Sequence, residues 1–274
     1  MKIEDQYNLA KNSLNGSLFA PYQREGVLWM LTMESQTSGP KGGFLCDEMG
    51  LGKTVQIVST MLGNPKGRTL IVVPKSIITQ WVEEIDKFAP NLTINIFDGP
   101  DRKIKEADVT IAPYSLLSIH EKSPLHMIQW DRVVLDEAHE IRNKKSKLFK
   151  SVCRLQTQIK WIVTGTPVFN SMEDFVSLCT FLGLSKVVVQ GMTSKIKDIY
   201  ILRRTKEDLA QINERLRLPP CYFENVELEM FPDEKQLYEI VFLEAQDTIR
   251  EAFRHAQSLN AKNMVILECL LRAR

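Results

Sequence analysis

The chain has 274 residues, of which 44% are hydrophobic and 25% charged, a composition typical of a globular protein with enough apolar material for a core. Its formal net charge of +1 excludes a globally cationic chain, so any binding to nucleic acid has to come from local basic surface. No apolar run approaches the ~20 residues that span a bilayer, and residues 1–20 do not resemble a signal peptide, so we expect an intracellular protein without a membrane partner.

Short apolar runs rich in β-branched residues predict buried strands along the chain. They cover Gly43–Cys46, Leu70–Val73, Val109–Ala112, Arg132–Leu135 and Trp161–Thr164. Between them, helical spacing predicts helices over Thr54–Leu62, Ser76–Phe88 and Ser146–Leu155. This alternating order predicts an α/β fold with a mostly parallel central sheet flanked by helices on both faces.

The pattern changes after about residue 184. A basic, broken segment with Arg203, Arg204 and Lys206 leads to a Leu-Pro-Pro break at 218–220. Apolar residues then recur at near-helical spacing over residues 233–258, which predicts a long amphipathic helix. We therefore expect an α/β domain over residues 1–185 and a helical extension over residues 186–274.

Polar segments directly follow four of the predicted strands. They are Asp47–Thr54, Pro74–Lys75, Asp136–His139 and Thr164–Pro167. Ligands of open α/β sheets bind outside the carboxyl ends of the strands, so these segments are predicted to line one site.

The first of these segments, between a predicted strand and a predicted helix, is typical of a phosphate-binding P-loop. Gly50 and Gly52 let the backbone bend so that successive N–H groups face phosphate oxygens. Lys53 is placed to meet the β and γ phosphates, and Thr54 to ligate Mg²⁺. Asp47 stands where the strict motif has its first glycine, so the match is incomplete. The predicted nucleotide-binding residues are Asp47, Glu48, Met49, Gly50, Leu51, Gly52, Lys53 and Thr54.

The acidic motif Asp136–His139 supplies two adjacent carboxylates at a strand end. Asp136 can hold the Mg²⁺ that Thr54 also serves, and Glu137 can orient or deprotonate the attacking water. Hydrolysis of a phosphoanhydride needs one acid for metal and one for water. Lys53, Asp136 and Glu137 are therefore the predicted catalytic residues, with Thr54 and Asp136 as the metal ligands.

Together, the P-loop, the acidic motif and Thr164–Pro167 resemble helicase superfamily two, and more narrowly its Swi/Snf-type chromatin-remodelling and DNA-repair translocases. Further matches run from about Leu18 to the C-terminus: Pro21–Gly26 with Trp29, Leu70–Pro74 with Trp81, Asn143, Asn170 and Leu202–Lys206. The resemblance implies the N-terminal RecA-like lobe of a motor, with ATP and Mg²⁺ as cofactors.

The resemblance also implies roles for single residues. Gln23 is expected to read the adenine edge, and a relay from nucleotide to DNA is expected at His139, Thr164, Gly165 and Thr166. Contacts to the DNA backbone are expected from Lys75, Ser76, Trp81, Tyr114, Asn143, Lys144, Lys145 and Lys147. For the lysines a solvated charged face is the alternative, and for Trp81 a place in the core.

Nothing in the sequence resembles the second RecA-like lobe, whose arginines stabilise charge on the transferring phosphate. Residues 264–274 resemble the entry into that lobe, cut short, so we expect the rest of the motor on the same polypeptide. An arginine finger contributes ~10³–10⁵ in rate, so the chain alone is expected to bind ATP and hydrolyse little of it.

The function that we infer is an ATP-dependent translocase that moves on double-stranded DNA without sequence preference and displaces bound proteins. Two alternatives stay open: a strand-separating DNA or RNA helicase, and a binding module that uses ATP only as a structural ligand. Accessory proteins are expected partners. The expected location is the nucleus in a eukaryote, and otherwise the nucleoid or a viral replication site.

Overall fold

The computed structural model describes residues 1–18, 21–100, 102–119, 123–165, 171–210, 222–227, 229–255 and 266–269, and within these ranges seven strands form one parallel sheet. Their order across the sheet is β3-β4-β2-β5-β6-β1-β7. The strands are β1 (Lys41–Leu45), β2 (Thr69–Val73), β3 (Ile94–Ile96), β4 (Val109–Pro113), β5 (Gln129–Asp136), β6 (Gln156–Val163) and β7 (Ile201–Leu202). The predicted α/β fold is confirmed, and all the described strand pairs are parallel.

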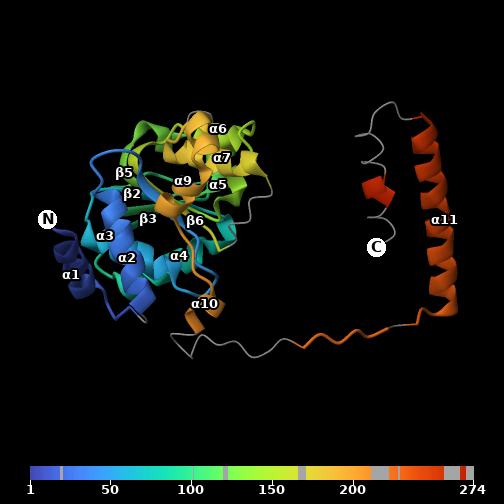
Figure 1. Ribbon diagram of the computed structural model, residues 1–274, viewed down its shortest axis with the longest axis horizontal. Helices are drawn as coiled ribbons and strands as arrows, with labels where there is room; N and C mark the ends of the chain where they lie inside the picture. The colour runs from blue at the N-terminus through green and yellow to red at the C-terminus, as the bar shows by residue number, and fades with distance from the viewer. Residues whose placement is uncertain are drawn as a thin grey trace. The chain divides into compact units, whose positions relative to one another are not determined.

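Helices cover both faces of the sheet (Figure 1). One face carries α1 (Ile3–Ser13), α2 (Pro21–Glu34), α3 (Lys53–Gly63) and α4 (Ile78–Phe88), the last preceded by a 3₁₀ turn over Lys75–Ile77. The other carries α5 (Tyr114–Ile119), α6 (Lys147–Val152), α7 (Met172–Leu182), α8 (Lys186–Gly191) and α9 (Thr193–Tyr200). Shorter 3₁₀ turns lie at Pro124–Met127 and Ala138–Ile141.

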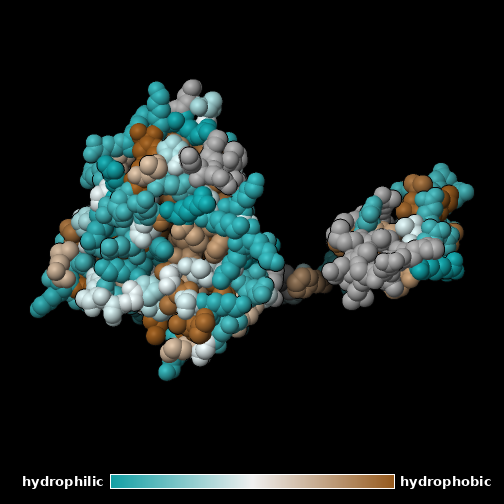
Figure 2. All heavy atoms as spheres, turned by 90° about the horizontal axis from the view of Figure 1, so that it is seen from above, coloured by the Kyte–Doolittle hydropathy of each residue, from teal (hydrophilic) through white to brown (hydrophobic). Residues whose placement is uncertain are grey.

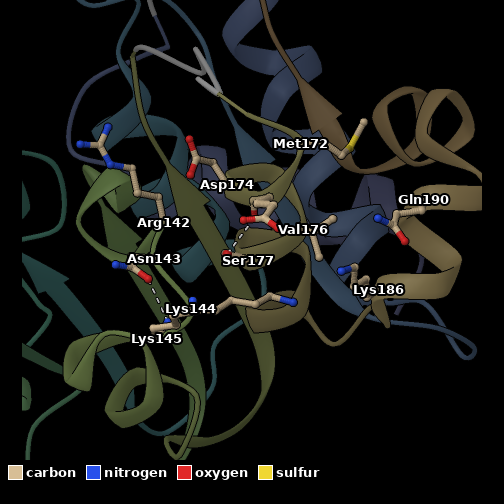
Figure 3. A pocket seen from close by; sticks show the side chains of 11 residues that line it. Arg142, Asn143, Lys144, Lys145, Met172, Asp174, Val176, Ser177, Lys186 and Gln190 are labelled. Atoms are coloured by element: carbon tan, nitrogen blue, oxygen red, sulfur yellow. Dashed lines mark hydrogen bonds between the residues drawn. The ribbon is translucent and has the colours of Figure 1, made fainter. Parts of the chain in front are cut away.

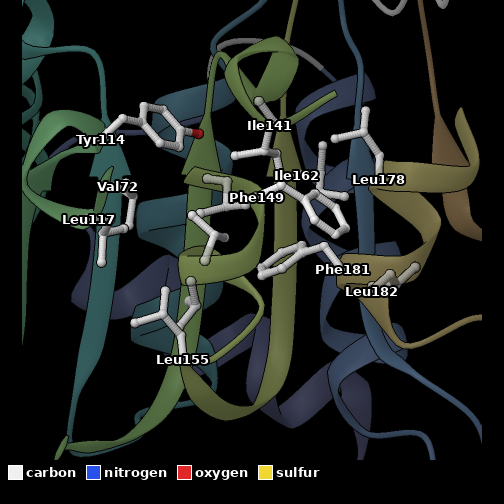
Figure 4. Close-up of a cluster of buried hydrophobic side chains, with 14 of the residues drawn as sticks. Val72, Tyr114, Leu117, Ile141, Phe149, Leu155, Ile162, Leu178, Phe181 and Leu182 are labelled. Atoms are coloured by element: carbon white, nitrogen blue, oxygen red, sulfur yellow. The ribbon is translucent and has the colours of Figure 1, made fainter. Parts of the chain in front are cut away.

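The strands are buried on both sides, and successive side chains serve different cores. On β5, Val133 and Leu135 belong to the cluster under α5–α9, whereas Val134 belongs to the cluster under α2–α4. Figure 4 shows the first cluster, in which Phe149 and Phe181 pack over the sheet beside Ile162. The sheet is thus a rigid middle layer that fixes where each strand ends.

The first structural unit contains the expected α/β domain and the segment that follows it. It spans Met1–Leu218, so the expected boundary at residue 185 falls inside it. The reason is β7, which pairs with β1 and is followed by α10 (Lys206–Ala210). A two-residue strand has no apolar run that sequence reasoning could detect.

The second unit, Pro219–Arg274, contains α11 (Pro232–His255). This confirms the predicted amphipathic helix as far as His255; residues 256–258 lie outside the described ranges. On α11 the rings of Tyr238 and Phe242 stack with centroids 6.0 Å apart.

None of the described helices is long and apolar enough to cross a membrane. On the face of the first unit that Figure 2 shows, hydrophilic side chains predominate and hydrophobic ones form small separate groups.

Candidate nucleotide site

The sheet register brings the P-loop and the acidic motif to the same edge. Strand β6 lies between β1 and β5, and Val163 pairs with Leu45 on one side and with Asp136 on the other. The segments that follow these three strands therefore start level with one another. The P-loop comes after β1 and Thr164–Gly165 after β6, and Asp136, the first residue of the acidic motif, is the last residue of β5.

The P-loop has the backbone that phosphate binding requires. Gly50 and Gly52 adopt left-handed conformations, with φ of 85° and 75°. Gly52 is the N-cap of α3 and supplies no side-chain cap, so the first helical N–H groups face the site without a capping partner. The Lys53 ammonium donates to the carbonyl of Asp47 at 2.9 Å. A cation on a flexible side chain beside uncapped amides fits a triphosphate.

Gly165 lies directly against this loop. A Cβ atom at Gly165 would lie 2.8 Å from Cγ of Met49 and 3.3 Å from Nζ of Lys53, so a larger residue would have to displace the P-loop. The neighbouring Thr164 is buried, and its N–H donates to Leu45 O at 3.2 Å. Two of the expected relay residues thus touch the nucleotide loop or its strand. Thr166, Pro167 and Asn170 lie outside the described residues.

Gln23 reaches the P-loop from α2. Its side-chain amide donates to Leu51 O at 3.2 Å, and a Cβ on Gly52 would come within 2.4 Å of its nitrogen. The side chain is only 5% exposed. Gln23 thus lies against the P-loop, and its expected contact with adenine stays a prediction.

Asp136 is held by two aromatic side chains. The indole N–H of Trp81 donates to Asp136 Oδ2 at 2.8 Å, and the Tyr114 hydroxyl donates to its carbonyl at 2.9 Å. Burial raises the pKa of Asp136, and the charge of Glu137 adds to this effect. The Trp81 hydrogen bond and the Lys53 charge act in the opposite direction. Lys53 and Asp136 therefore share one electrostatic environment.

Trp81 and Tyr114, which were expected among the DNA contacts, are both buried, and for Trp81 this is the place in the core that was the alternative. Trp81 is 2% exposed and Tyr114 4%, so neither ring is open to a nucleic acid. Both instead hold Asp136 through hydrogen bonds. Burial also raises the pKa of the Tyr114 hydroxyl well above its usual value, which keeps it a donor.

Glu137 adopts a strained backbone conformation. Its φ of 50° is the only left-handed value of a non-glycine residue in the described part of the chain, and such residues cost on the order of 1–3 kcal/mol. Its N–H donates to Asp136 Oδ1 at 2.9 Å, and its carboxylate lies 3.3 Å from Nδ1 of His139. The turn thus orients the two acids separately and brings His139 next to the second.

The side chains of Asp47 and Glu48 are occupied by a segment that the sequence did not assign to the site. The Asp47 carboxylate pairs with Arg204, and Glu48 Oε2 accepts from Lys206 N at 2.7 Å. Asp47 therefore offers the site its carbonyl rather than its carboxylate. The available signal for Arg204 was the basic run within Leu202–Lys206, which also matched the family resemblance but did not indicate Asp47 as its partner.

The remaining DNA candidates lie at the surface. Lys75 and Ser76 start the turn before α4, and the Lys75 ammonium is 3.2 Å from Asp98. Lys145 and Lys147 are exposed, and the amide N–H of Lys145 donates to the Asn143 side chain at 2.9 Å.

A pocket of about 620 Å³ lies beside these lysines (Figure 3). Lys144 and Lys145 lie on one side of it and Lys186 on another. The lining also contains Glu173 and Asp174, so its charge is mixed.

Comparison with known proteins gives consistent matches. The model of the SNF2-related domain matches residues 22–195. The chain is 33% identical over 195 residues to the "ISWI chromatin-remodeling complex ATPase ISW1" of Saccharomyces cerevisiae, covering 66% of this chain and 17% of that protein. It is 36% identical over 204 residues to the "ATP-dependent helicase rhp16" of Schizosaccharomyces pombe, covering 66% of this chain and 23% of that protein.

Among solved structures, the "Sulfolobus solfataricus SWI2/SNF2 ATPase core in complex with dsDNA" is similar, with a TM-score of 0.63 and 29% identity. The likeness covers 95% of this chain and 58% of that chain. The chain thus spans less than two thirds of the length of each of these relatives.

Proposed function

Because the SNF2-related domain model matches most of its first unit, the chain belongs to the SNF2-related ATPase family, and from this premise we propose that it is the first motor lobe of a DNA-dependent ATPase that translocates on double-stranded DNA. The observation that carries the proposal is the register across β1, β6 and β5. It starts the P-loop and the acidic motif at the same level of the sheet.

The residues of this edge divide the chemistry of ATP hydrolysis between them. Lys53 and the amides that begin α3 neutralise phosphate charge. Thr54 and Asp136 are the protein ligands for Mg²⁺, which supplies charge stabilisation when bound with ATP. Glu137 accepts the proton of the attacking water. Gln23 positions the base.

The DNA partner is proposed from the surface lysines and from the similar Sulfolobus solfataricus core, which was solved with double-stranded DNA. Lys75, Ser76 and Asn143 lie outside the buried motifs, together with Lys144, Lys145 and Lys147. Contacts from such residues to phosphates carry no sequence information, which suits a motor that moves along any duplex. Remodelling of protein–DNA complexes follows from such movement.

A second RecA-like lobe on the same polypeptide completes the proposed motor, because the relatives are longer than this chain. Its arginines supply a rate contribution of ~10³–10⁵ that this lobe lacks. The chain alone therefore binds ATP and turns it over slowly. We place the whole protein in the nucleus of a eukaryote, or at the nucleoid or a viral replication site otherwise, with accessory proteins as further partners.

The nucleotide site is tested by calorimetric titration of the chain with MgATP. The Lys53→Ala variant should lose most of the affinity, whereas Glu137→Gln should keep it, because Glu137 acts on water and not on the phosphates. If Lys53→Ala bound MgATP as tightly as the unaltered chain, the proposed nucleotide site would be wrong.

The motor is tested by steady-state phosphate release with and without duplex DNA. We expect little turnover from this chain, and DNA-stimulated turnover that Glu137→Gln abolishes when the second lobe is present. Brisk DNA-stimulated turnover by the chain alone would refute the division of labour between lobes.

A further inference from the structure

Arg204 makes a dense set of contacts beneath the P-loop. Its Nε donates to Asp47 Oδ1 at 2.9 Å, and its Nη2 donates to Asp47 Oδ2 at 2.5 Å, a two-pronged pairing. A further N–H donates to the carbonyl of Tyr22, and the guanidinium lies 5.2 Å from the centre of the Tyr22 ring. The Asp47 side chain is 0% exposed and that of Arg204 12%, so the pair is shielded from water.

Gln56 of α3 joins this pair to the phosphate-binding turn. Its carbonyl oxygen accepts from Arg204 Nη2 at 2.9 Å, and its amide nitrogen lies 3.1 Å from Asp47 Oδ2. The same nitrogen lies 3.3 Å from the carbonyl of Gly52 and 3.5 Å from that of Leu51. The loop carbonyls are thereby turned inward, which leaves the loop N–H groups for phosphate.

The backbone on either side of Arg204 is also tied to the loop. We call residues 201–206 the strap. Cys46 N donates to Leu202 O at 2.7 Å, and Glu48 N donates to Arg204 O at 3.0 Å. Lys206 N donates in turn to the Glu48 carboxylate at 2.7 Å. The strap therefore continues the β1–β7 pairing alongside the start of the P-loop.

Gly26 of α2 provides the space for this network. A Cβ atom at Gly26 would lie 1.9 Å from Oε1 of Gln56 and 2.8 Å from Nη2 of Arg204. A glycine inside a helix costs roughly 0.5–1 kcal/mol relative to alanine, so its presence here needs a reason. The contact of Gln56 with Arg204 supplies one.

We propose that Arg204 is a positioning residue for the P-loop, acting through the buried carboxylate of Asp47 and through Gln56. In the strict P-loop motif a glycine stands at the position of Asp47. Here the strap replaces that compact turn with an ion pair that holds the loop in its phosphate-accepting shape. The inference rests on the proposed nucleotide site for its consequence, but the loop shape itself is measurable without nucleotide.

The test compares Arg204→Gln with Arg203→Gln, its exposed neighbour of the same type. Hydrogen exchange of the nucleotide-free chain should show the bonded amides of Glu48 and Leu51 exchanging about tenfold faster or more in Arg204→Gln, while those of β5 stay unchanged. A change of this size is expected because the free energy that a hydrogen bond to a charged group contributes corresponds to a factor of ten or more in an equilibrium constant. The dissociation constant for MgADP should rise by a similar factor, and Arg203→Gln should change neither quantity.

Two further variants keep the test decisive if Arg204→Gln does not fold. Asp47→Asn removes the charge at constant size, and Gly26→Ala displaces Gln56 and Arg204 without altering any charge. Both should speed exchange in the loop. A general helix effect of Gly26→Ala has the opposite sign, because alanine favours the helix.

Loop exchange in these variants equal to that of Arg203→Gln would overturn the proposal. A chain that does not bind MgADP at all would refute the proposed nucleotide site, and the exchange difference would still decide the role of Arg204.

Discussion

Two buried arginine–carboxylate pairs lie in the first unit and differ in what surrounds them. Arg132 and Glu34 pair at 2.6 Å, with side chains 1% and 0% exposed. Trp161 Nε1 donates to Glu34 at 2.8 Å and Asn64 Nδ2 at 2.7 Å, so strands and helix ends close around that carboxylate. The Arg204–Asp47 pair instead joins loops. We call the sheet and the helix ends packed on it the frame. The same kind of ion pair therefore stabilises the frame in one place and the shape of the P-loop in the other.

The largest expected effect is on the frame. Replacing Arg132 by methionine leaves the Glu34 carboxylate buried without its cation, which costs about 3–5 kcal/mol. Urea denaturation should show this loss, while the folded protein still binds MgADP. Arg204→Gln should lower the free energy of unfolding clearly less than this, and it should weaken MgADP binding more. Equal losses of unfolding free energy in the two variants would contradict the claim that the two ion pairs have different roles.

A second contrast is between two buried indoles. Trp81 donates to Asp136 at the site, and Trp130 donates to the carbonyl of Leu125 at 2.9 Å in the frame. Trp81→Phe should weaken MgATP binding about tenfold, or about 1.4 kcal/mol, because Asp136 loses its orienting donor. Trp130→Phe should lower stability and leave binding unchanged. Calorimetric titration decides this, and matched affinities for both variants would leave Trp81 with a packing role alone.

A smaller effect separates the half-buried carboxylate of Asp136 from the fully buried one of Glu34. The raised pKa of Asp136 means that its ionised form costs free energy in the metal-free protein, about 1.4 kcal/mol for each tenfold weakening of the acid. Asp136→Asn should therefore unfold at higher urea than the unaltered chain at pH 8. That gain should shrink as the pH falls through the raised pKa and vanish below 3.8, where Asp136 is protonated in both states. A gain that grows toward acid pH would contradict the assignment, and Glu34→Gln should be destabilising throughout.

The smallest effect concerns the basic run that follows the acidic motif in the sequence. Changing Lys144, Lys145 and Lys147 to glutamine should lower DNA affinity and flatten its salt dependence, with the slope falling by about 0.9 for each phosphate that is no longer neutralised. The control changes Lys2, Lys11 and Lys66, which are exposed and lie at the N-cap of α1, on α1 and before β2. Fluorescence anisotropy with a labelled duplex at several salt concentrations measures both. An unchanged slope would mean that the three lysines do not contact DNA phosphates.

The contrast between frame and site also explains what the sequence could predict. Continuous apolar runs, such as Leu70–Val73 in β2, are detectable because a strand buried on both faces has few polar positions. The strands β3 and β7 have three and two residues, too few for a pattern. The P-loop and the acidic motif were detectable because phosphate chemistry restricts their residue types.

Other features of the site bring together residues that are far apart in the sequence. Asp47 and Arg204 are separated by 157 positions, and no local pattern joins them. Trp81 and Tyr114 were expected among the DNA contacts, with the core as the alternative for Trp81, since residue type does not reveal whether an aromatic ring is covered. Burial had to come from the structure.

The central claim is that Lys53, Thr54 and Asp136 serve one triphosphate–magnesium pocket. The most direct test is a crystal structure of the chain with a non-hydrolysable ATP analogue and Mn²⁺, whose anomalous scattering locates the metal. We predict a single peak bound by the Thr54 hydroxyl and close to the Asp136 carboxylate, with Lys53 on the phosphates. A nucleotide or metal bound elsewhere on the chain would contradict the account.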